Sequence, residues 1–276
     1  MPPLAFIQTP DGPIRYAQAG EGPDVVLIHG AMTSVEDMVL GPFDALAQRF
    51  RVTAFDRPGY GATTRERLRG APSSQAAHLL AAMHALDVGA AVVIGHSFGG
   101  AVAMAMALLA PERLGGVLAI SPIVFPELRL EHLLFGARAM PLAGEAIGYG
   151  PGRWMDAALL PILWPAMFAP QIMPPRFAAH YPFALASRPG PMLALGEEAV
   201  LALPDLAANA PRYRACKVPV EVFAGSRDWV TPPWGQATGL ARAVPGAKLT
   251  VLPGLGHMVH HFAAHDVVEA ATRLAS

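Results

Sequence analysis

The sequence contains little cysteine and little charge. Cys216 is the single cysteine among 276 residues, so no disulfide bond can form within the chain. Charged residues make up only 15% of the chain, and 20 Lys and Arg nearly balance 21 Asp and Glu. The formal net charge of −1 provides no basic surface of the kind that binds nucleic acid. No basic or strongly apolar segment opens the chain, so we expect no signal peptide and a cytoplasmic protein.

The sequence also lacks an uninterrupted apolar run long enough to cross a membrane. The longest candidate, residues 91–110, is broken in its middle by Gly95–Gly100, so we expect no integral membrane segment. A G-x-G-x-x-G dinucleotide fingerprint is absent, and we expect no cofactor. Apolar residues are abundant, however, at 53% of the chain, which allows a large core. The oligomeric state does not follow from these features.

Short apolar segments alternate with helical segments along most of the chain. This pattern predicts an α/β fold in which a mostly parallel central sheet carries helices on both faces. The predicted strands cover residues 4–8, 13–18, 24–28, 51–55, 92–94, 114–120, 218–223 and 248–252. The predicted helices cover residues 33–48, 73–87, 101–110, 233–243 and 259–274.

The alternation stops in the middle of the chain. Residues 123–214 are rich in proline, methionine and aromatic side chains, and they contain no convincing strand. We therefore predict a core domain made of residues 1–122 and 215–276, with residues 123–214 inserted between two strands as a helical cap.

A strand, a sharp turn and a helix meet at Ser97. The sequence Gly95-His96-Ser97-Phe98-Gly99 matches the G-x-S-x-G pattern of a nucleophile elbow. Small residues are needed on either side of the serine because the backbone passes close to itself there. The pattern therefore predicts that the Ser97 hydroxyl lies at the tip of the turn, in front of a helix N-terminus.

A serine hydroxyl needs a nearby base, and that base needs an acidic partner to orient it. Asp228 follows the predicted strand at 218–223, and His257 follows the strand at 248–252. The carboxyl ends of parallel strands form the edge where open α/β sheets build their sites. The order Ser, Asp, His along the chain is also the order found in α/β-hydrolases.

With these motifs the chain resembles the α/β-hydrolase family. The resemblance covers the chain outside the cap and also rests on His29-Gly30 and on Asp56-Arg57-Pro58-Gly59-Tyr60-Gly61. It implies an oxyanion hole made by the backbone N–H groups of Ala31 and Phe98. We expect a serine hydrolase that cleaves a carboxylic ester of an apolar small molecule through an acyl-enzyme, with Ser97, Asp228 and His257 as the catalytic triad.

Other activities use the same apparatus and stay open. They are thioester, lactone, amide or carbon–carbon bond hydrolysis, acyl transfer, and a cofactor-free haloperoxidase or perhydrolase reaction. A lipase that docks its apolar cap on lipid, and a binding protein that has lost its chemistry on this fold, are the remaining alternatives.

The cap is expected to select the substrate. It carries more large apolar side chains than so short a segment can bury on itself, so some should line a pocket above Ser97. Four candidates for substrate binding are Trp154, Trp164, Met167 and Phe168.

Histidines close to the motifs are interpreted as structural. His29 and His96 flank the site, and His260, His261 and His265 are interpreted as surface residues of the last helix. No carboxylate or cysteine completes a metal-ligand set with them at ligand spacing, so we expect no metal.

Overall fold

The computed structural model describes all residues, 1–276. Its centre is an eight-stranded sheet in the order β1-β2-β4-β3-β5-β6-β7-β8. Strand β2 pairs antiparallel with β1 and β4, and every other pairing is parallel. The strands are β1 (Leu4–Ile7), β2 (Ile14–Ala19), β3 (Asp24–Ile28), β4 (Arg51–Phe55), β5 (Ala91–His96), β6 (Leu114–Ile120), β7 (Val220–Gly225) and β8 (Lys248–Leu252).

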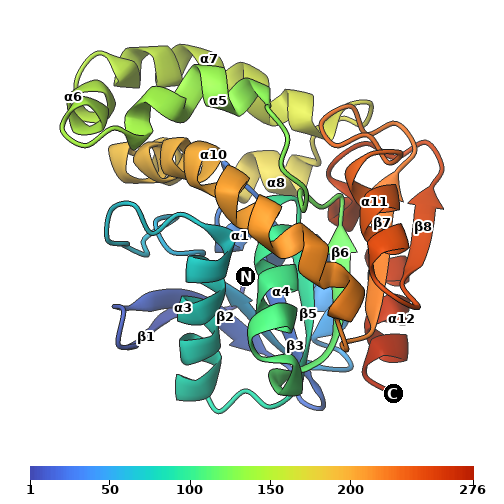
Figure 1. Cartoon of the computed structure of the whole chain (residues 1–276). Helices are drawn as coiled ribbons and strands as arrows, with labels where there is room; N and C mark the ends of the chain where they lie inside the picture. Colours follow the sequence, from blue (N-terminus) through green and yellow to red (C-terminus); the bar gives the residue numbers. More distant parts are fainter.

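Helices surround the sheet and fill the long connection between β6 and β7 (Figure 1). Those around the sheet are α1 (Val35–Met38), α2 (Asp44–Leu46), α3 (Pro72–Ala85), α4 (Phe98–Leu109), α11 (Gln236–Ala243) and α12 (Ala264–Leu274). Those of the connection are α5 (Leu130–Phe135), α6 (Ala143–Tyr149), α7 (Gly152–Phe168), α8 (Pro175–His180), α9 (Phe183–Ala186) and α10 (Pro189–Asn209).

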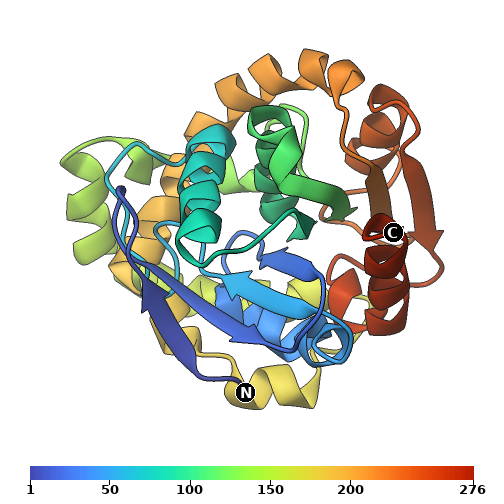
Figure 2. The same ribbon diagram turned by 90° about the horizontal axis from the view of Figure 1, so that it is seen from below.

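Both faces of the sheet are buried. One face packs against α3, α4 and α11 in a cluster of 34 buried residues, and the other packs against α1, α2 and α12 in a cluster of 23. Figure 2 shows the two helical layers on opposite sides of the strands. Burial on both faces explains why the central strands, such as β3 and β5, are continuous apolar runs rather than alternating ones. The predicted α/β fold with a mostly parallel sheet is confirmed.

Two predicted helices differ from the structure. The helix expected over 33–48 is split into α1, a π-helical turn at Val39–Phe43 and α2. Gly41 leaves helical geometry (φ −94°, ψ −114°), and Pro42 lacks the N–H that a regular helix needs. The closing helix starts at Ala264 rather than 259, because residues 259–261 form a separate 3₁₀ turn.

The helices between β6 and β7 cover the carboxyl edge of the sheet, at the top of Figure 1. Their apolar side chains form a third cluster of 12 buried residues, among them Trp164, Phe168 and Phe177. Met32, Leu40 and Met258 from the rest of the chain belong to the same cluster, so this helical layer packs directly on the loops that follow the strands. None of the helices combines the length and apolar character required to span a bilayer.

Candidate active site

Ser97 lies in a strained turn between β5 and α4. Its backbone has φ 53° and ψ −117°, a region that residues with a side chain rarely adopt. A Cβ at position 95 would lie 2.2 Å from the carbonyl oxygen of Gly99, and one at position 99 would lie 2.4 Å from that of Ile28. Only glycine fits at these two positions, so the local sequence and the packing of β3 on β5 together produce the turn.

Asp228 and His257 form a buried pair beyond the ends of β7 and β8. His257 Nδ1 donates to Asp228 Oδ2 at 2.9 Å, and the two residues are each 2% exposed. Asp228 also accepts hydrogen bonds from the N–H groups of Val230 and Thr231 and from the Thr231 hydroxyl. Burial alone would raise the pKa of Asp228, but the His257 ring and these hydrogen bonds lower it below its ordinary value. Asp228 is thus an ionised acceptor for the N–H of His257 Nδ1, and His257 Nε2 has no hydrogen-bond partner within the protein.

The elbow and this pair lie side by side. The ring of His96, which precedes Ser97, is 4.7 Å from the ring of His257, and its Nε2 donates to the His257 carbonyl at 3.2 Å. The Ser97 hydroxyl itself makes no hydrogen bond to a protein group, including His257. Bonds between a nucleophile and its base are often long in unliganded enzymes and tighten when substrate binds.

The loop after β3 brings free backbone N–H groups to the elbow. Ala31 lies outside helices and strands, and its N–H donates no hydrogen bond within the protein. Phe98 is the first residue of α4, where the N–H has no partner in the helix. Ala31 and Phe98 both line the same small cavity.

Buried side chains hold this loop in place. His29 Nδ1 donates to the Gly30 carbonyl at 2.8 Å, and His29 Nε2 accepts the backbone N–H of Arg57 at 2.9 Å. Burial, and secondly the charge of Arg57, lower the pKa of His29 well below its ordinary value, so the ring is neutral. The Arg57 side chain donates to the carbonyls of His29 and Gly30, each at 2.9 Å.

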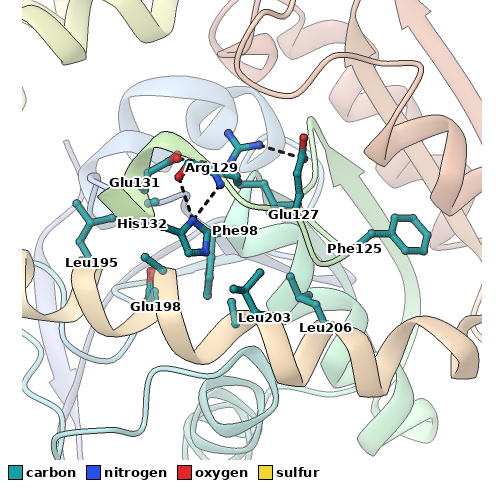
Figure 3. Close-up of a pocket in the computed structure, with 14 residues that line it drawn as sticks. Phe98, Phe125, Glu127, Arg129, Glu131, His132, Leu195, Glu198, Leu203 and Leu206 are labelled. Atoms are coloured by element: carbon teal, nitrogen blue, oxygen red, sulfur yellow. Dashed lines mark hydrogen bonds and ion pairs between the residues drawn. The ribbon is translucent and has the colours of Figure 1, made fainter. Parts of the chain in front are cut away.

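Two cavities adjoin the site. The smaller, about 40 Å³, lies between Phe98 and α10, as Figure 3 shows, and also reaches Ala31. The larger, about 350 Å³, extends from Met32 between Leu134, Met167 and Val230. Glu127, Arg129 and Glu131 line both cavities, so the segment that leads into α5 and the first turn of that helix lie between the two spaces.

The four residues expected to bind substrate have different positions. Met167 lines the larger cavity. Trp164 is 4% exposed and donates its indole N–H to the Met32 carbonyl at 3.1 Å, so it contacts the loop that carries Ala31. Phe168 is buried against Phe177. Trp154 lies on the surface, with 70% of its area exposed, and lines neither cavity.

The interpretation of His260 and His261 as surface residues was wrong. His260 is fully buried, the His261 side chain is 2% exposed, and both belong to the 3₁₀ turn before α12. Asp37 Oδ1 accepts a hydrogen bond from Nε2 of each ring, at 3.1 and 2.8 Å. The three side chains offer ligand atoms within 4.8 Å of one another, but the hydrogen bonds account for their arrangement. Sequence spacing could not reveal this group, because Asp37 is more than 220 residues away from both histidines.

Sequence reasoning also missed the partner of Arg57. Glu198 on α10 is 1% exposed and accepts a hydrogen bond from Arg57 Nη1 at 2.5 Å. The signal was present: Glu197 and Glu198 are adjacent carboxylates in an otherwise apolar helical stretch, where unpaired charges would be costly.

The Alpha/beta hydrolase family model matches residues 25–271, which is nearly the whole chain. The chain belongs to this family. The match includes the elbow, the loop with Ala31, and the segments that carry Asp228 and His257.

Individual relatives differ in activity. The dihydrolipoyllysine-residue acetyltransferase component of the acetoin cleaving system from Cupriavidus necator is 39% identical over 114 residues, 41% of this chain and 30% of that protein. The 2-hydroxy-6-oxo-6-phenylhexa-2,4-dienoate hydrolase of Comamonas testosteroni is 32% identical over 117 residues, 40% of each chain. These alignments thus span less than half the length of either relative.

The same fold occurs in solved structures of other hydrolases. The enol-lactonase from Burkholderia xenovorans aligns over 98% of this α/β-hydrolase and 99% of its own chain, with a TM-score of 0.77 and 21% sequence identity. At this identity the likeness establishes the shared fold, and the substrate has to be argued from the site.

Proposed function

We propose that this α/β-hydrolase is a serine hydrolase that cleaves a carboxylic ester of an apolar small molecule through an acyl-enzyme. The observation that carries the proposal is the buried hydrogen bond from His257 Nδ1 to Asp228 Oδ2, next to a serine at the tip of a strained elbow. A neutral imidazole with its Nδ1 proton fixed has Nε2 available as a general base.

In the proposed mechanism, Ser97 Oγ attacks the ester carbonyl carbon while His257 Nε2 takes the hydroxyl proton. The resulting oxyanion receives the N–H groups of Ala31 and Phe98, and each such donor contributes roughly 3–4 kcal/mol in a dry site. His257 then gives the proton to the leaving alcohol, and the C–O bond breaks to form the acyl-enzyme. A water molecule, activated by His257, releases the acid and restores Ser97. Asp228 stabilises the imidazolium in both half-reactions.

The cavities support an apolar substrate. The larger one is lined mainly by apolar side chains such as Leu134, Leu163 and Met167, and its volume of about 350 Å³ suits a small organic molecule. The smaller one, about 40 Å³, adjoins Ala31 and Phe98 and admits only a short group. We therefore place the short part of the ester beside the oxyanion hole and the larger part under the helices of residues 123–214, which act as the cap.

The decisive experiment combines an ester panel with active-site labelling. Wild-type protein is incubated with nitrophenyl esters of increasing acyl length and with a fluorophosphonate probe, in parallel with Ser97→Ala. We expect ester turnover and a single covalent label on Ser97, both lost in the variant. Absence of label and turnover in the wild-type protein would refute the proposal. If the wild-type protein is labelled but turns over only lactones or thioesters, Ser97 remains the proposed nucleophile, and the proposal that the substrate is a carboxylic ester is refuted.

A further inference from the structure

The helical segment and the core domain meet at a buried carboxylate. Glu198 of α10 receives three hydrogen bonds, from Arg57 Nη1 at 2.5 Å, the Tyr60 hydroxyl at 2.6 Å and Gln75 Nε2 at 2.7 Å. All three donors belong to the chain between β4 and the first turn of α3, whereas Glu198 lies in the insertion between β6 and β7. Figure 3 shows Glu198 on α10, next to Phe98.

The same arginine reaches both sides of the proposed oxyanion hole. Its Nε and Nη2 donate to the carbonyls of His29 and Gly30, the two residues that precede Ala31, and Nη1 also donates to Gln75 Oε1. Its guanidinium carbon lies 4.7 Å from the centre of the Phe98 ring. Arg57 is fully buried, so no water competes for these contacts. Its position therefore depends on its charged partner, because a buried guanidinium without a counter-charge is strongly unfavourable.

We propose that Glu198 is a positioning residue: by fixing Arg57, it holds the backbone of His29 and Gly30 so that the Ala31 N–H points to where the oxyanion forms. The inference rests on the proposed function, since it concerns the same oxyanion hole. It also links the docking of α10 to catalysis, because Glu198 reaches Arg57 only when α10 lies on the core.

Glu197 provides a matched control on the same helix. It is as buried as Glu198, at 1% exposure, and it is ion-paired with Arg65 at 2.7 Å and with Arg67. Neither of these arginines bonds to the loop that carries Ala31. Arg65 Nη1 also lies 3.7 Å from Glu198 Oε1. Loss of charge at 197 therefore disturbs the attachment of α10, while the hydrogen bonds from Arg57 to Glu198 and to the carbonyls of His29 and Gly30 keep both of their partners.

The test compares Glu198→Gln with Glu197→Gln. We expect both variants to melt at a lower temperature, but only Glu198→Gln to lower kcat for nitrophenyl butyrate, by roughly tenfold to a hundredfold with little change in KM, because the oxyanion donor is misplaced. The rate of labelling by the fluorophosphonate should fall in the same proportion. Equal kcat values in the two variants would overturn the positioning role.

A milder variant keeps the proposal testable if Glu198→Gln does not fold. Tyr60→Phe removes one donor to Glu198 and leaves every hydrogen bond of Arg57 in place. We expect kcat to fall by about threefold to tenfold, within the range of one net hydrogen bond, because the Glu198 carboxylate then has one donor fewer to hold it against Arg57. A folded Tyr60→Phe protein with wild-type kcat would overturn the proposal. If wild-type protein takes no label and turns over no ester, the proposed function fails and the positioning role fails with it.

Discussion

Single residues decide whether the elbow can form. Gly95 and Gly99 allow the backbone approaches that place Ser97 at φ 53°. The strain at Ser97 persists because β5, α4 and the end of β3 are all packed around it. Glycine is required here for space rather than for flexibility, since neither Gly95 nor Gly99 has a positive φ.

Gly95→Ala tests this close packing. The added methyl would lie 2.2 Å from a backbone oxygen that cannot move without displacing α4. We expect the free energy of unfolding to fall by about 3 kcal/mol or more, as measured by urea denaturation. Gly190→Ala is the control, because a Cβ there meets nothing within 4 Å and alanine is the better helix former in α10. A loss of similar size in both variants would contradict the packing argument.

At the scale of elements, α7 and α10 meet the loop after β3 from two sides. Trp164 of α7 binds the carbonyl of Met32, and Glu198 of α10 acts through Arg57 on the carbonyls of His29 and Gly30. Ala31 lies between these anchors. The helical insertion thus supplies contacts to the loop of the proposed oxyanion hole in addition to walls for the cavities.

Trp164→Phe tests the anchor from α7. The change keeps an aromatic ring in the third buried cluster but removes the N–H that donates to Met32. The Met32 carbonyl keeps only a long hydrogen bond, 3.5 Å, from the Tyr181 hydroxyl. We expect a stability loss of about 1–3 kcal/mol from the lost hydrogen bond and the missing ring volume, together with a lower kcat for nitrophenyl esters. Trp154→Phe on the same helix is the comparison, since its side chain is 70% exposed. It should change stability by no more than about 0.5 kcal/mol. A larger loss of stability in Trp154→Phe than in Trp164→Phe would contradict the role of Trp164 as an anchor of this loop.

At the scale of the whole molecule, buried titratable groups make stability depend on pH. Burial is the main reason that the pKa values of His29 and His96 lie well below 6.5. The nearby charge of Arg57 lowers the pKa of His29 further, and that of His260 does the same for His96. The unfolded chain therefore binds more protons than the folded protein as pH falls below about 6.5. Burial of His261 acts in the same direction.

We expect the free energy of unfolding to fall as pH is lowered from 7 to 5.5. Each of these histidines contributes up to about 1.4 kcal/mol per pH unit. Asp56 acts in the opposite direction, because burial raises its pKa to about 6 and the folded state then takes up a proton. Burial also raises the pKa of Asp156, which acts in the same direction as Asp56. The three histidines outnumber these two carboxyls, so the free energy of unfolding still rises with pH between 5.5 and 7. Urea denaturation at pH 7.0, 6.0 and 5.5 measures it, and a stability that rises on acidification would contradict the assignment.

Sequence alone determined the sheet and the positions of the proposed triad. The central strands, such as β3 and β5, are short apolar runs. Ser97, Asp228 and His257 each follow a strand, so the parallel sheet brings them to one edge. The elbow was predictable because its glycines, Gly95 and Gly99, lie only two residues from Ser97 in the chain. The roles of these residues, the boundaries of the cap at 123 and 214, and a cytoplasmic location stay predictions.

Only the tertiary structure revealed the contacts between distant segments. Asp37 meets His260 and His261, Glu198 meets Arg57, and Trp164 meets Met32. Each contact joins residues more than 130 positions apart, and the packing of helices on the sheet sets the distance between them. A sequence pattern shows which face of an element is apolar, but the partners of a buried charge depend on how those faces are stacked.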